Sequence, residues 1–137
     1  MDLNLTVVYK RIANMSNLTN NSGQTFITTV YDKKDGVIVG VLDASDFTEA
    51  LYRIFAQDCT TVLVEETKSG GDIAVVSVTD PDFGVVNAFQ TTLPKADMLD
   101  TIVPQGQYTH SFKVINSAGL ELPPVFQNTV SIVRACD

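Results

Sequence analysis

The stretch "QGQYTHSFKVINSAGLELPP", residues 105–124, alternates like a β-strand, bends at a glycine and stops at two prolines. Successive side chains of a strand point to opposite faces. One face therefore carries a row that is apolar apart from the only histidine of the chain: Tyr108, His110, Phe112 and Val114. We expect this row to face the core, with His110 as a partly buried structural residue that has one hydrogen-bond partner. Ser111 points to the opposite side and cannot be its nucleophilic partner.

Similar strand-like segments fill most of the chain and are separated by Gly, Pro, Asn and Asp. Asp35-Gly36 predicts a hairpin between residues 25–31 and 37–42. "KSGGD" predicts a second hairpin, between residues 60–67 and 73–79. "DPDFG" at 80–84 predicts a turn, and the stretch 94–106 leaves room for one short helical turn. About eight strands at this spacing indicate an all-β sandwich or barrel.

One segment, "SDFTEALYRIFAQ" at residues 45–57, predicts an α-helix. Ser45 or Asp46 is a suitable N-cap residue, and Asp46 with Glu49 has the spacing of a capping box. Glu49 and Arg53 form an i,i+4 pair on the outer side of this helix. Its apolar residues recur at helical spacing and are expected to pack on the core: Phe47, Leu51, Ile54 and Phe55.

The length of 137 residues suits one domain, residues 1–137, with an N-terminal arm at about 1–6 and a polar loop at 13–24. The formal net charge of −7 disfavours nucleic acid and anionic membrane surfaces as partners. The N-terminus has no signal-peptide pattern, and no apolar run reaches the length of a membrane span. We therefore expect folding in a cytosol, with Cys59 and Cys136 as free thiols, although a disulfide between them stays open.

The sequence predicts no catalytic residue, no cofactor and no metal site. Glu65 and Glu66 are adjacent in a predicted strand, so their carboxylates point to opposite faces. Asp80 and Asp82 could contribute to a calcium site, but the spacing of a calcium-binding loop is missing and a plain turn is favoured. Phosphate-loop and nucleophile-elbow motifs are missing as well.

The second half of the chain resembles the immunoglobulin-like β-sandwich domains of tailed-bacteriophage virion proteins, including the N-terminal domain of baseplate upper proteins. Its motifs are an Asp-Pro-x-x-Gly turn, a Pro-x-Gly-x-Tyr start to a strand, and a last strand ending in valines and a basic residue. The matching positions are Asp80, Pro81, Gly84, Pro104, Gly106, Tyr108, Phe112, Val114, Gly119, Val130, Val133 and Arg134. A tyrosine in this position can tie a corner of a sandwich to its backbone.

The resemblance implies an immunoglobulin-like sandwich of about seven to eight strands, with the helix at 45–57 as an insertion. It also implies a non-enzymatic virion structural protein, assembled in the bacterial cytoplasm. The expected role is a capsid decoration (cement) protein that binds the major capsid protein in multiple copies or as a homo-oligomer. An adaptor in a tail, neck or baseplate is the alternative, and a small enzyme or carbohydrate-binding module is the alternative of another class. Expected partner contacts are apolar residues of the arm and loop: Leu3, Leu5, Met15 and Leu18. For Met15 and Leu18 an equal alternative is that they fold back over an edge of the sandwich.

Overall fold

The protein is built from β-strands in the computed structural model, which describes residues 6–9 and 17–134. Its only helices there are two single 3₁₀ turns, η1 (Ala44–Asp46) and η2 (Lys95–Asp97). The second of these is the short helical turn predicted between residues 94 and 106. The strands are β1 (Thr6–Tyr9), β2 (Asn17–Thr19), β3 (Gln24–Thr28), β4 (Val30–Lys34), β5 (Val37–Val41), β6 (Phe47–Phe55), β7 (Val62–Thr67), β8 (Ile73–Asp80), β9 (Gly84–Leu93), β10 (Gly106–Asn116) and β11 (Phe126–Val133).

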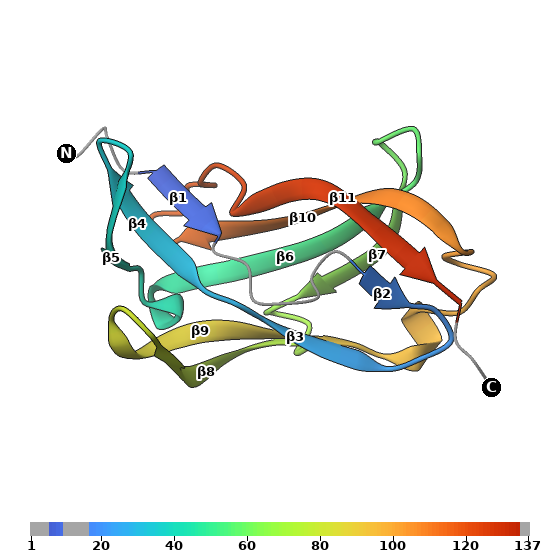
Figure 1. The fold of residues 1–137 in the computed structure, drawn as a ribbon, viewed down its shortest axis with the longest axis horizontal. Coiled ribbons are helices and arrows are strands. Elements are labelled where there is room, and N and C mark those ends of the chain that lie inside the picture. Colours follow the sequence, from blue (N-terminus) through green and yellow to red (C-terminus); the bar gives the residue numbers. More distant parts are fainter. Residues whose placement is uncertain (1–5, 10–16, 135–137) are drawn as a thin grey trace.

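Two sheets pack face to face over one hydrophobic core, as a β-sandwich does (Figure 1). The first sheet has the strand order β2-β11-β10-β6-β7, and the second has the order β3-β9-β8. Phe112 on β10 and Phe89 on β9 meet between them, with ring centroids 5.5 Å apart. A third, small sheet of order β1-β4-β5 extends from one end of the sandwich.

The predicted α-helix at 45–57 is wrong, because this segment forms η1 and the nine-residue strand β6. Its sequence also satisfies a period of two, with Ala50, Tyr52 and Ile54 buried on one face. Strand β6 lies between β10 and β7, so its backbone groups pair on both sides. Arg53 accordingly pairs with Glu65 across the β6–β7 ladder and not with Glu49 of its own segment. Packing in the sheet outweighs the helical periodicity.

The Asp35-Gly36 hairpin is confirmed, with both residues at positive φ (52° and 81°) and Lys34 paired with Val37. Its first strand differs from the prediction, since residues 25–31 divide between β3 and β4, which belong to different sheets. The "KSGGD" segment is not a hairpin turn but a crossover between sheets, because β7 pairs with β6 and β8 pairs with β9. The turn at "DPDFG" is confirmed and joins β8 to β9.

The row on β10 faces the core as predicted, with His110, Phe112 and Val114 buried. Tyr108 stands at the start of this strand, and its hydroxyl donates a hydrogen bond of 2.6 Å to the carbonyl oxygen of Pro104. This contact ties the chain entering β10 to the strand itself, as in the tyrosine corner of other sandwiches.

Candidate protein-binding surface

The predicted partner contacts do not form a described surface. Leu3, Leu5 and Met15 lie outside the described residues. Leu18 is on β2, is 5% exposed and belongs to the core cluster. Of the two alternatives for Leu18, the exposed contact is therefore wrong and the folding back over the sandwich holds: β2 pairs with β11, and Leu18 is buried.

His110 is more deeply enclosed than expected, and each of its ring nitrogens has a hydrogen-bond partner, where only one partner was expected. Its Nε2 lies 2.7 Å from Oδ1 of Asn128, and its Nδ1 lies 2.8 Å from the hydroxyl of Tyr52. Because Oδ1 only accepts, Nε2 carries the proton and Nδ1 accepts the Tyr52 hydroxyl proton. The ring also packs against Phe126, with centroids 4.7 Å apart. This arrangement holds the core together and supports the structural interpretation of His110.

Strand β5 carries three consecutive exposed apolar side chains. Val37 is 61% exposed, Val39 is 50% exposed, and Ile38 between them is also exposed. Consecutive residues point to opposite faces, so both faces of β5 are open. A β-bulge contributes to this, because Asp32 pairs with Gly40 and Lys33 with Ile38, which leaves Val39 as the extra residue. Within residues 6–9 and 17–134, β5 pairs only with β4.

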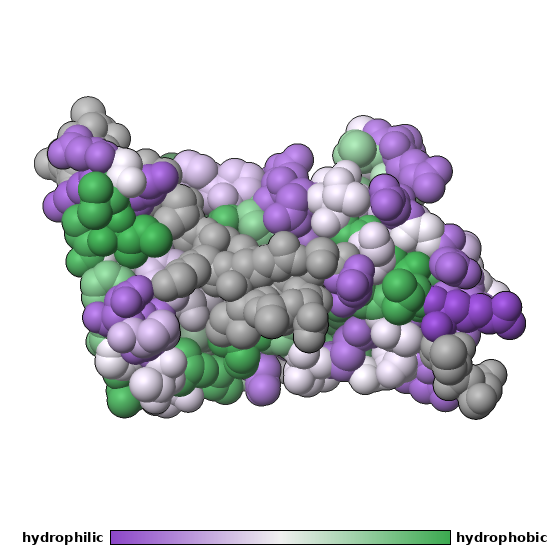
Figure 2. Space-filling view, viewed as in Figure 1, coloured by the Kyte–Doolittle hydropathy of each residue, from purple (hydrophilic) through white to green (hydrophobic). Residues whose placement is uncertain are grey.

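The β8–β9 hairpin carries two more exposed apolar side chains at the same end of the molecule. Val85 is 74% exposed, and Phe83 is exposed beside it, in tilted contact with Tyr31 of β4. A groove of about 410 Å³ lies between the end of β5 and the start of β9, lined by Val41, Asp43, Val85, Val86 and Asn87. Figure 2 shows hydrophobic side chains gathered at this end of the molecule. We call Val37, Ile38, Val39, Phe83 and Val85 the β5-edge surface.

The β5-edge surface was missed because "VIVGVL" was read only as a hairpin strand. The signal in the sequence for an exposed apolar surface is the run Val37, Ile38 and Val39 directly after the Asp35-Gly36 turn. A strand with one buried face alternates polar and apolar residues, and this one does not. Its apolar residues are left in solvent because the hairpin extends beyond the sandwich.

Asp80 fixes the small sheet and the β8–β9 turn to each other. Its Oδ1 accepts the backbone N–H groups of Asp82 and Phe83, at 2.8 and 3.2 Å, and its Oδ2 accepts the Tyr31 hydroxyl. Burial and the adjacent Asp80 carboxylate raise the pKa of Tyr31. Oδ1 of Asp80 is thus occupied by the turn and Oδ2 by Tyr31 of β4, which supports the turn interpretation over a calcium site formed with Asp82.

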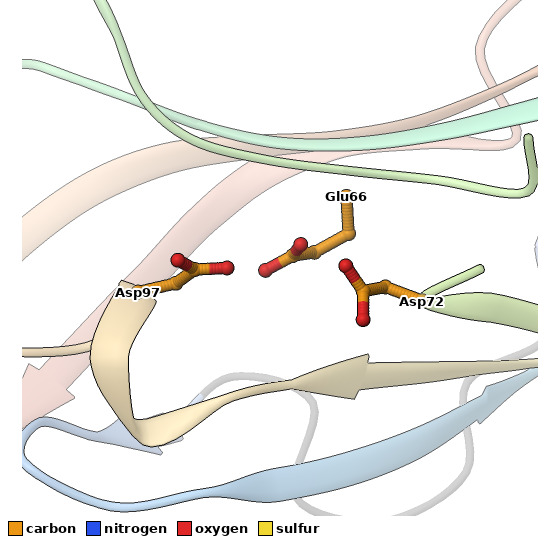
Figure 3. Close-up of side chains that lie close together, drawn as sticks. All are labelled: Glu66, Asp72 and Asp97. Carbon is orange, nitrogen blue, oxygen red and sulfur yellow. The ribbon is translucent and has the colours of Figure 1, made fainter. Parts of the chain in front are cut away.

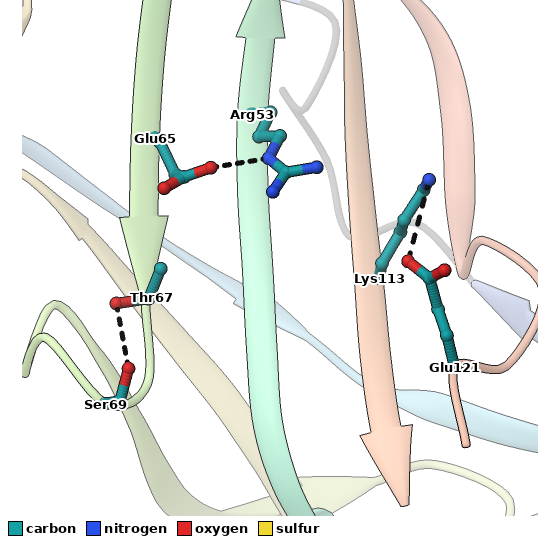
Figure 4. A network of polar contacts seen from close by, with 6 residues as sticks. All are labelled: Arg53, Glu65, Thr67, Ser69, Lys113 and Glu121. Atoms are coloured by element: carbon teal, nitrogen blue, oxygen red, sulfur yellow. Dashed lines mark hydrogen bonds and ion pairs between the residues drawn. The ribbon is translucent and has the colours of Figure 1, made fainter. Parts of the chain in front are cut away.

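The outer face of the five-stranded sheet is polar (Figure 4). Arg53 pairs with Glu65 at 2.6 Å, and Lys113 pairs with Glu121 at 3.7 Å. Exposed ion pairs of this kind contribute about 0–1 kcal/mol each. They keep this face hydrophilic, in contrast to the β5-edge surface.

Glu66 points to the interior, opposite Glu65, as the strand position predicts. There its carboxylate meets those of Asp72 and Asp97, and one oxygen from each residue lies within 4.8 Å of the other two (Figure 3). Burial raises the pKa of Glu66 to about 9, and the neighbouring Asp97 and Asp72 carboxyl groups act in the same direction. This cluster, the Glu66 cluster, was not predicted, because residues 72 and 97 approach residue 66 only in the folded chain.

Cys59 is a free, exposed thiol in the turn after β6, and Cys136 lies outside the described residues. None of the helices in the described part of the chain is long and apolar enough to cross a membrane. No family model matches the chain, and no curated protein and no solved structure matches it either.

Proposed function

We propose that the protein is a non-enzymatic binding module of a bacteriophage particle, a decoration protein that binds the capsid surface through the β5-edge surface. The observation that carries this proposal is the exposure of Val37, Ile38 and Val39 on both faces of a strand that, among the described residues, has a neighbouring strand on one side only. Contiguous exposed apolar residues on a small protein are typical of protein-binding sites. Burial of these side chains under a capsid subunit would remove them from water.

An immunoglobulin-like arrangement of the sandwich supports the resemblance on which the phage assignment rests. The order β3-β9-β8 corresponds to strands B, E and D of that fold, and β11-β10-β6-β7 corresponds to G, F, C and C′. Tyr108 then occupies the tyrosine-corner position at the start of strand F. His110, two residues later, occupies the position of the second cysteine in antibody domains. In this alignment His110 bonds to Tyr52 of strand C, its neighbour in the same sheet, and Phe26 of strand B packs against Tyr52 from the opposite sheet.

The proposed role of the protein is to stabilise the assembled capsid shell. A subunit that binds only the assembled shell stabilises that shell by mass action. Many copies at symmetry-related positions make individually weak contacts collectively strong. The net charge of −7 keeps the free subunit from binding the packaged DNA. The apolar β5-edge surface contributes affinity, and the bulge at Val39 opposes indiscriminate strand pairing between free copies.

Co-sedimentation with undecorated phage heads tests the proposal. The wild-type protein at micromolar concentration is expected to sediment with the heads, and Val39→Asp is expected to weaken binding at least about tenfold. Val62→Asp is the matched control, since Val62 is 42% exposed but lies on β7 in the five-stranded sheet. It should bind as the wild type does.

Two further arms of the same experiment separate the alternatives. Binding to isolated tails or baseplates, without binding to heads, would replace the decoration role by the adaptor role. Binding to a glycan array, without binding to either particle, would favour a carbohydrate-binding module. Equal binding of Val39→Asp and wild type to heads would remove the β5-edge surface from the proposal.

A further inference from the structure

The Glu66 cluster joins three separate parts of the sandwich. Glu66 lies on β7 in the five-stranded sheet, Asp72 directly precedes β8 in the three-stranded sheet, and Asp97 ends η2 in the connection to β10. Figure 3 shows the three carboxylates directed toward one another from these elements. The cluster is therefore a point where both sheets and a connecting segment meet.

The carboxyl group of Glu66 has other carboxyl groups, those of Asp97 and Asp72, as its hydrogen-bonding neighbours, and no ion pair of Glu66 with a basic side chain is found in the described part of the chain. Glu66 is 2% exposed, and its Oε2 is shielded from solvent without a hydrogen-bond partner. The ion pairs found among residues 17–134 involve Arg53 with Glu65 and Lys113 with Glu121, and none reaches the Glu66 cluster. A buried, unpaired carboxylate is costly, and two more carboxylates beside it add repulsion.

We propose that Glu66, Asp72 and Asp97 bind a divalent metal cation, and that Ca²⁺ is the ion that fits best. Ca²⁺ takes oxygen ligands at about 2.3–2.6 Å, so two ligands on opposite sides of the ion are up to about 5 Å apart. The three oxygens lie within 4.8 Å of one another and can share one such ion. Mg²⁺, with oxygens at about 2.1 Å, requires a closer set.

The backbone holds two of the ligands in place before any ion binds. The N–H of Asp72 donates to the carbonyl oxygen of Thr67 at 3.2 Å, and the carbonyl of Asp72 accepts the N–H of Thr92 at 2.7 Å. The N–H of Asp97 donates to the carbonyl oxygen of Pro94 at 3.0 Å. Positions fixed in this way reduce the entropy that binding costs. The site thus requires little rearrangement.

A bound ion would act as a clamp between the sheets, since its ligands come from β7, from the start of β8 and from η2. Anything that binds the folded state alone stabilises it. Calcium would therefore raise the unfolding temperature of the free protein. This effect does not depend on a capsid partner, so its failure would leave the proposed function standing, and the reverse also holds.

The test is a calcium titration of the full chain after treatment with EDTA, followed by calorimetry and by thermal unfolding. One ion per chain is expected, with a saturable rise in unfolding temperature and a weaker response to Mg²⁺. Asp97→Asn is expected to lower the affinity at least about tenfold, because changes even outside the first ligand shell cost ~10–100-fold. Asp100→Asn, an exposed neighbour on the same segment, is the control and should bind normally.

Glu66→Gln is a second variant that keeps the test decisive if Asp97→Asn does not fold. It replaces the buried carboxyl group by an amide of the same shape that is neutral at every pH, so it is expected to unfold at a higher temperature than the wild type in EDTA and to show no calcium response. No heat of binding and no thermal shift for the wild type at millimolar Ca²⁺ would overturn the proposal. An undiminished calcium response in both Asp97→Asn and Glu66→Gln would overturn it as well.

Discussion

His110 and Glu66 are both polar residues on the inner face of the five-stranded sheet, and the protein treats them differently. His110 has a partner for each ring nitrogen and aromatic rings on its flanks. Glu66 faces two more acids and has a buried oxygen without a partner. The comparison shows that burial alone does not distinguish a structural polar residue from one in a binding site. The two kinds are distinguished by how many hydrogen-bonding groups and charges the protein leaves without a partner.

Tyr52 stands between the two regions. It is the register partner of Glu66 across the β6–β7 ladder, while its hydroxyl proton is donated to His110. Phe26 of the opposite sheet packs edge-on against its ring, with centroids 4.9 Å apart. The network around His110 is therefore complete within the protein, whereas the Glu66 cluster needs protons or a cation from outside.

The largest expected effect on unfolding free energy comes from a change in the hydrogen-bond network around His110. His110→Ala removes a buried ring and leaves the Tyr52 hydroxyl without its acceptor, so we expect a loss of about 3 kcal/mol of unfolding free energy. Urea denaturation would measure it. Thr129→Ala, an exposed change on the neighbouring strand β11, should stay within about 0.5 kcal/mol. If His110→Ala also lost no more than about 0.5 kcal/mol of unfolding free energy, the contrast between the His110 network and the Glu66 cluster would be wrong.

Glu66→Gln should act in the opposite direction. At pH 8 in EDTA it is expected to stabilise the protein by about 1–2 kcal/mol, because a neutral amide replaces a carboxyl group whose ionisation is opposed by burial. The same denaturation experiment gives this value. Glu65→Gln is the matched control on the opposite face of β7, where only an exposed ion pair is lost. Destabilisation by Glu66→Gln would mean that the cluster is satisfied in a way that its geometry does not reveal.

Tyr108→Phe sharpens the comparison with a single hydrogen bond. The variant loses the contact to the Pro104 carbonyl and little else, so we expect a cost of about 1 kcal/mol. A change in urea midpoint with an unchanged slope would confirm it. No measurable change would indicate that the tyrosine corner does not stabilise the entry into β10.

The smallest effect on stability is expected at the β5-edge surface. Val39→Asp changes an exposed bulge residue, so the unfolding free energy should shift by no more than about 0.5 kcal/mol. Its loss of binding in co-sedimentation would then be a surface effect. A large destabilisation, measured by thermal unfolding, would show instead that Val39 supports the small sheet.

The residues that could be predicted from sequence are those whose neighbours are close in the chain. Asp35-Gly36 specifies its turn through backbone conformation, and the alternation through Phe112 identifies a core strand. The segment 47–55 is wrongly predicted as a helix because its apolar residues fit both the helical period of 3.6 and the strand period of two. Only pairing with the flanking strands β10 and β7 decides between helix and strand. Local sequence does not contain that information.

The Glu66 cluster and the β5-edge surface depend on contacts between distant parts of the chain. Asp97 lies 31 residues after Glu66 in the sequence and reaches it because it stands in the connection by which the chain returns from β9 to β10 in the five-stranded sheet. The opposite faces of Glu65 and Glu66 were predictable, but the acids that meet Glu66 were not. The polar neighbours of Leu18 leave open whether it is exposed or folded back over the sandwich, and pairing with β11 decides for burial.

The most direct test of the central contrast is the pH dependence of unfolding free energy for wild type and Glu66→Gln, both in EDTA. The pKa of Glu66 rises from 4.5 in the unfolded chain to about 9 in the folded protein, so the folded state binds the proton more tightly. Its contribution is fully present below the unfolded pKa and is lost as the pH rises toward 9. Wild-type stability should therefore fall across this interval relative to that of Glu66→Gln. Parallel curves for the two proteins would contradict the account.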